Sequence, residues 1–103
     1  MKFIIPWRNL PNWQQEITLG QETYLLNFRW NSLNSFWVMD IYTRNQEPII
    51  LGIKVVVNYD ITSHYIRENL FPGSILVIDF SFDVDEIKRE DMGDRVQLIY
   101  KES

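Results

Sequence analysis

The strand register of one hairpin can be assigned from the sequence alone. Residues 24–30 and 36–42 are two apolar, aromatic runs that flank the polar stretch 31–35. Folding the chain about the middle of that stretch places large apolar residues opposite one another: Trp30 and Trp37, Phe28 and Met39, Leu26 and Ile41. Opposed residues of an antiparallel pair share one face of the sheet, and a slip of one residue would invert the faces. The sequence therefore specifies this register and predicts an antiparallel β protein with an aromatic core.

The composition indicates a single packed domain. The chain has 103 residues, of which 46% are hydrophobic and 15% are aromatic. This is the length of one domain, and its large, stiff side chains suit a small β core. The chain contains no cysteine, so disulfides, cysteine-bound zinc and thiol catalysis are excluded. Packing alone must hold the fold.

Other segments continue the β pattern along most of the chain. Alternating or β-branched runs predict further strands at residues 15–19, 49–57, 75–82 and 95–100. Three glycines mark structural positions, with a bulge or close backbone approach at Gly52 and turns at Gly73 and Gly93. Thr62 or Ser63 is the expected cap of one short helical segment near residues 62–70.

These elements divide the chain into two regions. Pro6 and Pro11 interrupt residues 1–13, which we expect to form an extended aromatic arm, and residues 14–103 form a single β domain. About six mostly sequential strands favour a small antiparallel barrel, because closure removes exposed strand edges. A two-sheet sandwich is the alternative.

The charge distribution argues against several kinds of partner. The net charge is −4 and the basic residues are scattered, so no nucleic-acid-binding surface is evident. No stretch approaches the ~20 apolar residues that span a membrane. Residues 1–7 are too short for a secretory signal. We therefore expect a protein that is made in the cytoplasm and stays there unless an assembly takes it elsewhere.

No pattern of residues favours catalysis or metal binding. His64 is the only histidine and directly follows Ser63, which is a poor geometry for a catalytic triad, and no nucleophile elbow is present. The acidic stretch 83–94 lacks the spacing of a calcium-binding loop and indicates a solvated loop. We expect no cofactor and no enzyme, because only Asp40 and Asp79 could serve as paired carboxylates.

Asp40 has a simpler structural explanation. Acids within the strands of a small domain more often pair with an arginine or cap a turn. Arg29 lies on the same polar face of the hairpin as Asp40, so we expect a cross-strand ion pair. An exposed pair of this kind contributes about 0.2–1 kcal/mol.

The aromatic residues divide into core and arm positions. The hairpin and the last strand supply the predicted core, which is Leu26, Phe28, Trp30, Trp37, Met39, Ile41 and Tyr100. Trp7 and Trp13 lie in the proline-interrupted arm near Arg8, a composition typical of protein–protein hot spots, although both rings could instead pack over the domain. The candidate interface residues are Trp7, Arg8, Trp13, Tyr59, Tyr65 and Phe71.

Several segments form a set that also occurs in a known family. They are Trp30 with residues 37–41, Pro48-Ile49 with Gly52, residues 73–79, and residues 93–100. This set, spread over roughly residues 14–101, resembles the phage baseplate plug family, which comprises small proteins of contractile-tailed phages and is typified by a cyanophage plug. The segment 63–69 departs from the family pattern.

The resemblance implies a structural role in the virion. The protein would plug the hub or tube lumen at the tail baseplate, without catalysis, through contacts with hub, spike and tube proteins. The threefold or sixfold symmetry of the hub implies a homotrimer. The alternative function is an OB-like module that binds oligosaccharide or single-stranded nucleic acid, and it requires an exposed aromatic platform.

Overall fold

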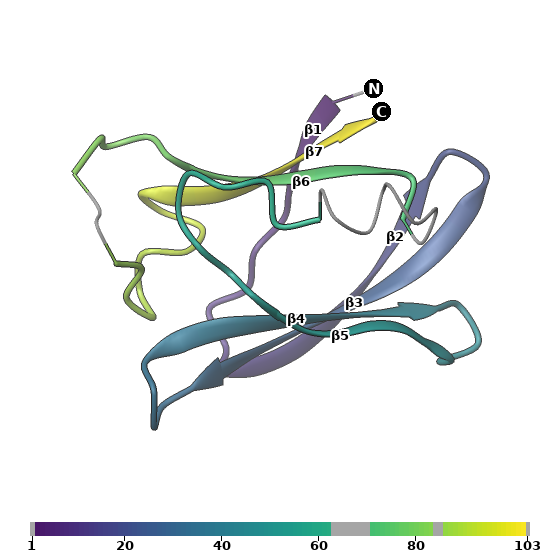
Figure 1. The fold of residues 1–103 in the computed structure, drawn as a ribbon, viewed down its shortest axis with the longest axis horizontal. Helices are drawn as coiled ribbons and strands as arrows, with labels where there is room; N and C mark the ends of the chain where they lie inside the picture. Colours follow the sequence, from purple (N-terminus) through teal and green to yellow (C-terminus); the bar gives the residue numbers. More distant parts are fainter. Residues whose placement is uncertain (1, 63–70, 84–85, 103) are drawn as a thin grey trace.

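The structure is a computed structural model that describes residues 2–62, 71–83 and 86–102. In these residues seven strands form two antiparallel sheets, seen as two layers in Figure 1. One sheet has the order β1-β7-β6 and the other has the order β2-β3-β4-β5. The strands are β1 (Lys2–Ile5), β2 (Asn12–Leu19), β3 (Glu22–Asn31), β4 (Phe36–Thr43), β5 (Pro48–Lys54), β6 (Gly73–Asp79) and β7 (Val96–Glu102). The predicted all-β class is confirmed.

The predicted hairpin register is confirmed in β3 and β4. The opposed pairs are Trp30 with Trp37, Phe28 with Met39, and Leu26 with Ile41. Trp30 is partly buried, and the other five side chains of this face lie in the core between the sheets. At the hairpin tip the Asn34 N–H donates to Asn31 Oδ1 at 3.0 Å, which fixes the turn.

The described strands form no closed barrel, which corrects the barrel prediction in favour of the two-sheet sandwich. No ladder joins β1 to β2, or β5 to β6. After β5, the Val55 N–H still donates to Trp37 O of β4 at 3.0 Å, whereas the Ile61 N–H donates to Ile75 O of β6 at 3.0 Å. The chain therefore crosses from one sheet to the other between Val55 and Ile61 instead of extending a shared ladder.

The segment expected to be an arm contributes strands to both sheets. Residues 2–5 form β1, which pairs with β7 at the far end of the chain, and Asn12 and Trp13 begin β2. The sequence carries no local signal for β1 because its pairing partner is remote.

The predicted helical segment at 62–70 lies, apart from Thr62, outside the described residues. Thr62 is buried at a turn, and its hydroxyl oxygen accepts a hydrogen bond from the Ile75 N–H at 2.9 Å. The Thr62 N–H in turn donates to Asp60 Oδ1 at 3.0 Å. These bonds fix the point at which the chain leaves the edge of β6.

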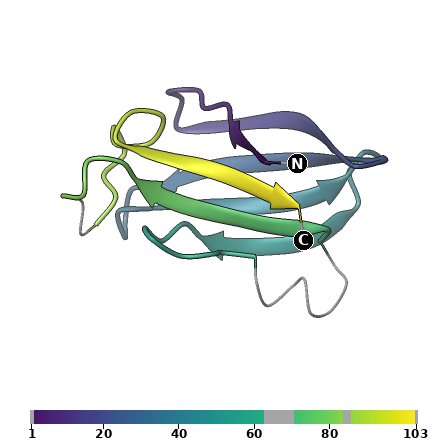
Figure 2. The same cartoon turned by 90° about the horizontal axis from the view of Figure 1, so that it is seen from above.

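The sandwich has two different ends. Because β1 pairs with β7, the two chain termini lie close together towards one end (Figures 1 and 2). The connecting segments 6–11, 32–35 and 55–58, together with residues 80–83 and 86–95, gather towards the other end, which we call the loop end. Two of these segments are in direct contact, since Gly93 lies against the Trp7 ring.

Candidate protein-protein interface at the loop end

Exposed apolar side chains are concentrated at the loop end. Leu33, at the tip of the β3–β4 hairpin, is 90% exposed, and Phe82, in the loop after β6, is 95% exposed. Three more exposed apolar residues belong to the segments that gather there: Leu10, Val56 and Phe80. Apolar side chains gathered on one surface mark sites of interaction with other molecules. The loop end is therefore the candidate interface.

Hydrogen bonds to Asp79 fix the loop that carries Phe82. The buried Asp79 carboxylate accepts the Ser81 N–H at 2.8 Å, the Ser81 hydroxyl at 2.6 Å and the Asp83 N–H at 2.8 Å. Arg95 adds a bond from Nε to Ser81 Oγ at 3.2 Å. Phe82 itself has φ of 59°, a conformation that bulky residues rarely adopt. The loop thus holds Phe82 away from the core by interactions on both sides of it.

The second half of this loop is organised by Asp91. The Asp91 carboxylate accepts the Lys88 N–H at 2.8 Å, and its carbonyl accepts the Val96 N–H at 3.0 Å. Gly93, with φ of 80°, follows in the left-handed region, and a Cβ there would lie 2.9 Å from the Trp7 ring. Glycine is therefore required at position 93 both for the turn and for the close approach of Trp7.

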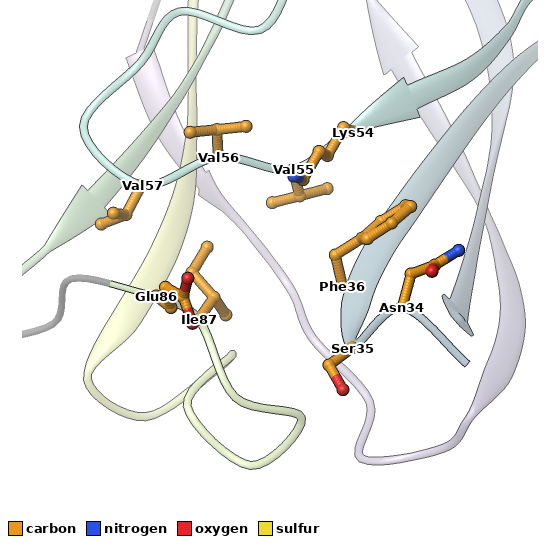
Figure 3. Close-up of a pocket in the computed structure, with 9 residues that line it drawn as sticks. All are labelled: Asn34, Ser35, Phe36, Lys54, Val55, Val56, Val57, Glu86 and Ile87. Atoms are coloured by element: carbon orange, nitrogen blue, oxygen red, sulfur yellow. The ribbon is translucent and has the colours of Figure 1, made fainter. Parts of the chain in front are cut away.

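A pocket of about 170 Å³ opens between three of the loop-end segments (Figure 3). Its apolar walls come from the β3–β4 hairpin, the exit of β5 and the loop before β7: Phe36, Val55, Val56, Val57 and Ile87. The Lys54 ammonium lies 4.9 Å above the Phe36 ring centroid, and Glu86 lies on the side formed by the loop. We call this the loop-end pocket.

The arm tryptophans pack inward, which is the second of the two alternatives left open by the sequence. The Trp7 ring centroid lies 5.0 Å from that of Trp13 and 4.9 Å from those of Phe28 and Trp37. Trp13 is buried and Trp7 is partly buried. Within the described residues the buried indole N–H groups of Trp7, Trp13 and Trp37 have no hydrogen-bond acceptor. The edge-to-face packing of these rings is a geometry in which an N–H group can point at a ring face.

Phe71, another candidate interface residue, is buried near the chain termini. Its ring centroid lies 5.4 Å from that of Tyr24 and 6.1 Å from that of Tyr100. Burial, and then the Glu102 carboxylate, raise the pKa of Tyr100 above its ordinary value. Phe71 therefore packs between the sheets rather than on the surface.

The remaining candidate interface residues differ in position. Arg8 and Tyr59 are exposed. Tyr59 lies in the segment that crosses from one sheet to the other. Tyr65 lies outside the described residues. Three of the six candidates, Trp7, Trp13 and Phe71, thus pack into the domain.

The expected ion pair of Asp40 is present. Arg29 Nε donates to Asp40 Oδ2 at 3.2 Å, and the Gly52 N–H donates to Asp40 Oδ1 at 2.7 Å. Gly52, with φ of 76°, lies in the expected bulge, where the β4–β5 ladder shifts register between Met39 and Ile41. Burial would raise the pKa of Asp40, but the bonds from Arg29 and Gly52 outweigh it and hold that pKa below 3.8.

Both acids that could have served in catalysis therefore have structural roles. Asp40 accepts hydrogen bonds from Arg29 and from the Gly52 N–H in the bulge, and Asp79 accepts the Asp83 N–H in the loop after β6. Among the described residues no group of three or more His, Cys, Asp or Glu side chains could hold a metal ion. Across the same residues, no helix has the length and apolar character needed to cross a membrane.

Sequence reasoning missed the exposed residues of the loop end. Phe80 and Phe82 were expected to end a strand at 75–82, but β6 ends at Asp79. The signal was an aspartate followed two residues later by a serine, the spacing at which a carboxylate accepts bonds from the following turn. Leu33 carried a signal too, because a single leucine within a polar hairpin tip cannot reach the core.

The fold and the loop end together define the class of the protein, which is a small two-sheet β domain with exposed apolar side chains at one end. The family described as cyanophage baseplate Pam3 plug gp18 matches residues 2–103, and the chain belongs to this family. No curated protein matches the chain. Family membership confirms the resemblance drawn from the sequence and places the protein in the virion, as a structural part of the phage tail baseplate that interacts with other baseplate or tail proteins. The family is a structural one and not a family of enzymes.

Proposed function

We propose that the protein plugs the lumen of the baseplate hub and tube, and that it is held there by contacts of its loop end with hub, spike or tube proteins. We further propose that it acts as a homotrimer that matches the symmetry of the hub. Membership of the plug family supports a blocking role, and the small size of the two-sheet sandwich supports a part that is seated among neighbours.

The observation that carries this proposal is the exposure of Leu33, Phe80 and Phe82 at one end of the domain. Fully burying one such side chain against a partner contributes about 1.5–3 kcal/mol. Internal hydrogen bonds fix the polar hairpin tip and residues 80–83 after β6, so little ordering of these residues is needed on binding. The loop end therefore has both the apolar groups and the rigidity that an assembly contact requires.

The alternative of an OB-like ligand-binding module has weaker support. It needs aromatic rings on an exposed sheet face. Phe28 and Trp37 are buried between the sheets, and Trp30 is partly buried against them. We therefore do not adopt it.

The test is co-expression with the hub, spike and tube proteins of the same phage, followed by affinity purification. Leu33→Ser should reduce co-purification on the order of tenfold, the loss of one buried apolar anchor. Leu51→Ser is the matched control, because Leu51 is also exposed but lies on β5 and outside the loop-end segments. Equal retention of both variants, or no co-purification of the unaltered protein with any of the three partners, would contradict the proposal.

A further inference from the structure

We propose that the free edge of β2 accepts an extended, basic segment of another baseplate protein as a fifth strand of its sheet. The contact is separate from the apolar residues of the loop end and goes beyond the proposed function. It joins two backbones, so the evidence for it lies in the hydrogen-bonding groups that β2 turns away from the domain.

Every second residue of β2 turns its backbone away from β3. Pro11 O accepts the Trp30 N–H at 2.8 Å, and the β2–β3 ladder continues from there without a break in register. Bonded and non-bonded pairs alternate along an antiparallel ladder, so Trp13 and every second residue after it bond β3. The backbone groups that point outward are those of Asn12, Gln14, Glu16 and Thr18. Within the part of the chain that the structure describes, these backbone groups form no hydrogen bond.

The other sheet edges are protected in ways that β2 is not. Among the described residues, the segment that crosses between the sheets covers β6, where the Val77 N–H donates to Tyr59 O at 2.9 Å. The strand β5 begins at Pro48 and contains the bulge at Gly52, and β1 has only four residues. Coverage, proline, bulges and short length all keep an edge from pairing with another chain. In contrast, β2 has eight residues, no proline and no break in its pairing with β3.

The molecular complement of such an edge is an extended segment. A row of outward N–H and C=O groups is matched by the backbone of one further strand, and proteins use this geometry to bind extended peptides. In Figure 2, β2 lies at the border of its sheet, with no other described strand beyond it. At about 3.4 Å per residue, its eight residues offer an edge of about 27 Å.

Charge favours a basic segment as the occupant. Glu16 is the only charged residue of β2, and its side chain is exposed. Opposite charges directly across a strand pair are stabilising, whereas like charges are destabilising. The segment should therefore carry lysine or arginine opposite Glu16, which also suits the net charge of −4 on the whole chain. A second copy that paired through its own β2 would have no cation to offer.

The two faces of β2 determine the rest of the pattern. Trp13, Ile17 and Leu19 are buried on the inner face, and the residues between them face solvent or are partly exposed. Directly opposed residues of paired strands share one face. The segment should therefore alternate between apolar residues that face inward and polar or basic residues that face outward.

The first measurement is co-purification with the hub, spike and tube proteins of the same phage, using two variants at one position. Gln14→Pro removes an outward N–H, and a proline in an edge strand is tolerated where its nitrogen faces solvent. It should weaken co-purification on the order of tenfold, the loss of one or two backbone hydrogen bonds. Gln14→Ala keeps the N–H and should bind like the unaltered protein. Equal retention of the two variants would overturn strand addition.

The second measurement tests the charge of the segment and does not depend on a proline being tolerated. Glu16→Lys should reduce co-purification on the order of fivefold, because it replaces an opposite charge by a like charge. Glu47→Lys is the matched control, since Glu47 is also exposed but lies in the turn before β5. Equal effects of the two variants would reject a basic segment on β2.

The third measurement is hydrogen exchange at residue resolution, with and without each of the three proteins. In the free chain the amides of Gln14, Glu16 and Thr18 should exchange faster than that of Ile17, which bonds β3. The bound segment should slow the three outward amides at least about tenfold. Unchanged exchange with all three proteins overturns strand addition. Protection that appears in the chain alone and grows with its concentration would identify a second copy as the occupant and overturn the baseplate segment.

The variants separate this contact from the proposed function. If Leu33→Ser reduces co-purification and Gln14→Pro does not, the loop-end contact stands and strand addition is wrong. If only Gln14→Pro reduces it, strand addition stands and the loop-end contact is wrong.

Discussion

The two sheets of the domain differ in how far apart along the chain their paired strands lie. Strands β2 to β5 are consecutive and are joined by short turns, such as the two-residue turn between Leu19 and Glu22. In the other sheet β1 pairs with β7, so that Phe3 lies opposite Tyr100. Closing such a long loop costs chain entropy before any contact forms. The first sheet can define its own register, whereas the second depends on the core that both sheets share.

The largest expected effect comes from weakening the long-range pairing at Ile5. This side chain is 1% exposed and lies in the core, so Ile5→Ala should lower the free energy of unfolding by about 2–5 kcal/mol. The neighbouring Ile4 is 54% exposed, and Ile4→Ala should change it by no more than about 0.5 kcal/mol. Urea unfolding followed by tryptophan fluorescence and circular dichroism measures both.

This pair of variants also tests whether β1 belongs to the domain or acts as a detachable arm. Coincident transitions by the two probes would mean that both sheets unfold together. If Ile5→Ala were as stable as Ile4→Ala, β1 would contribute little, and the long-range sheet would be less dependent on the shared core than we argue.

The same difference between the sheets explains what the sequence could predict. In β3 and β4, each apolar residue has its partner within the same short hairpin, so the register followed from the order of the side chains. The strand β1 has four residues and no partner nearby, and only the folded chain brings Tyr100 opposite Phe3. Long-range pairing of this kind leaves no periodic signal in a local window.

Individual side-chain contacts follow the same rule: those within one hairpin could be predicted, and those between distant segments could not. The ion pair of Arg29 and Asp40 was expected, because both residues lie on one hairpin. The loop-end pocket was not, because its walls come from three segments that are far apart in sequence. Trp7 shows the limit of prediction from composition. The composition of the arm around it indicated an interface, yet the Trp7 ring packs inward against Trp13 and Trp37.

A smaller effect is expected where the arm and the loop before β7 meet. Gly93 and Gly20 both have positive φ, and a Cβ at Gly93 would lie 2.9 Å from the Trp7 ring, whereas nothing lies within 4 Å at Gly20. Alanine at either position meets the left-handed backbone cost of about 1–2 kcal/mol. Gly93→Ala should therefore lower the free energy of unfolding by about 1–3 kcal/mol more than Gly20→Ala does, because the added methyl group overpacks against Trp7. Thermal unfolding of the two variants measures the difference, and equal values would mean that Trp7 moves aside freely.

The smallest effect is expected in the local sheet, at the pair of Asp40 and Arg29. The pKa of Asp40 is lower in the folded protein than its ordinary value of 3.8, so the ionised carboxylate stabilises the fold above that pH. This contribution is lost as the pH falls through the folded-state pKa, in the window below about pH 4. The Arg29 side chain is about half exposed, which limits the pair to about 0.2–1 kcal/mol. Asp40→Asn should flatten this part of the acid unfolding curve, and Arg29→Met should flatten it less, because the bond from the Gly52 N–H remains. An unchanged curve in Asp40→Asn would show that the carboxylate contributes no acid-dependent stability, so that packing alone would hold the local sheet.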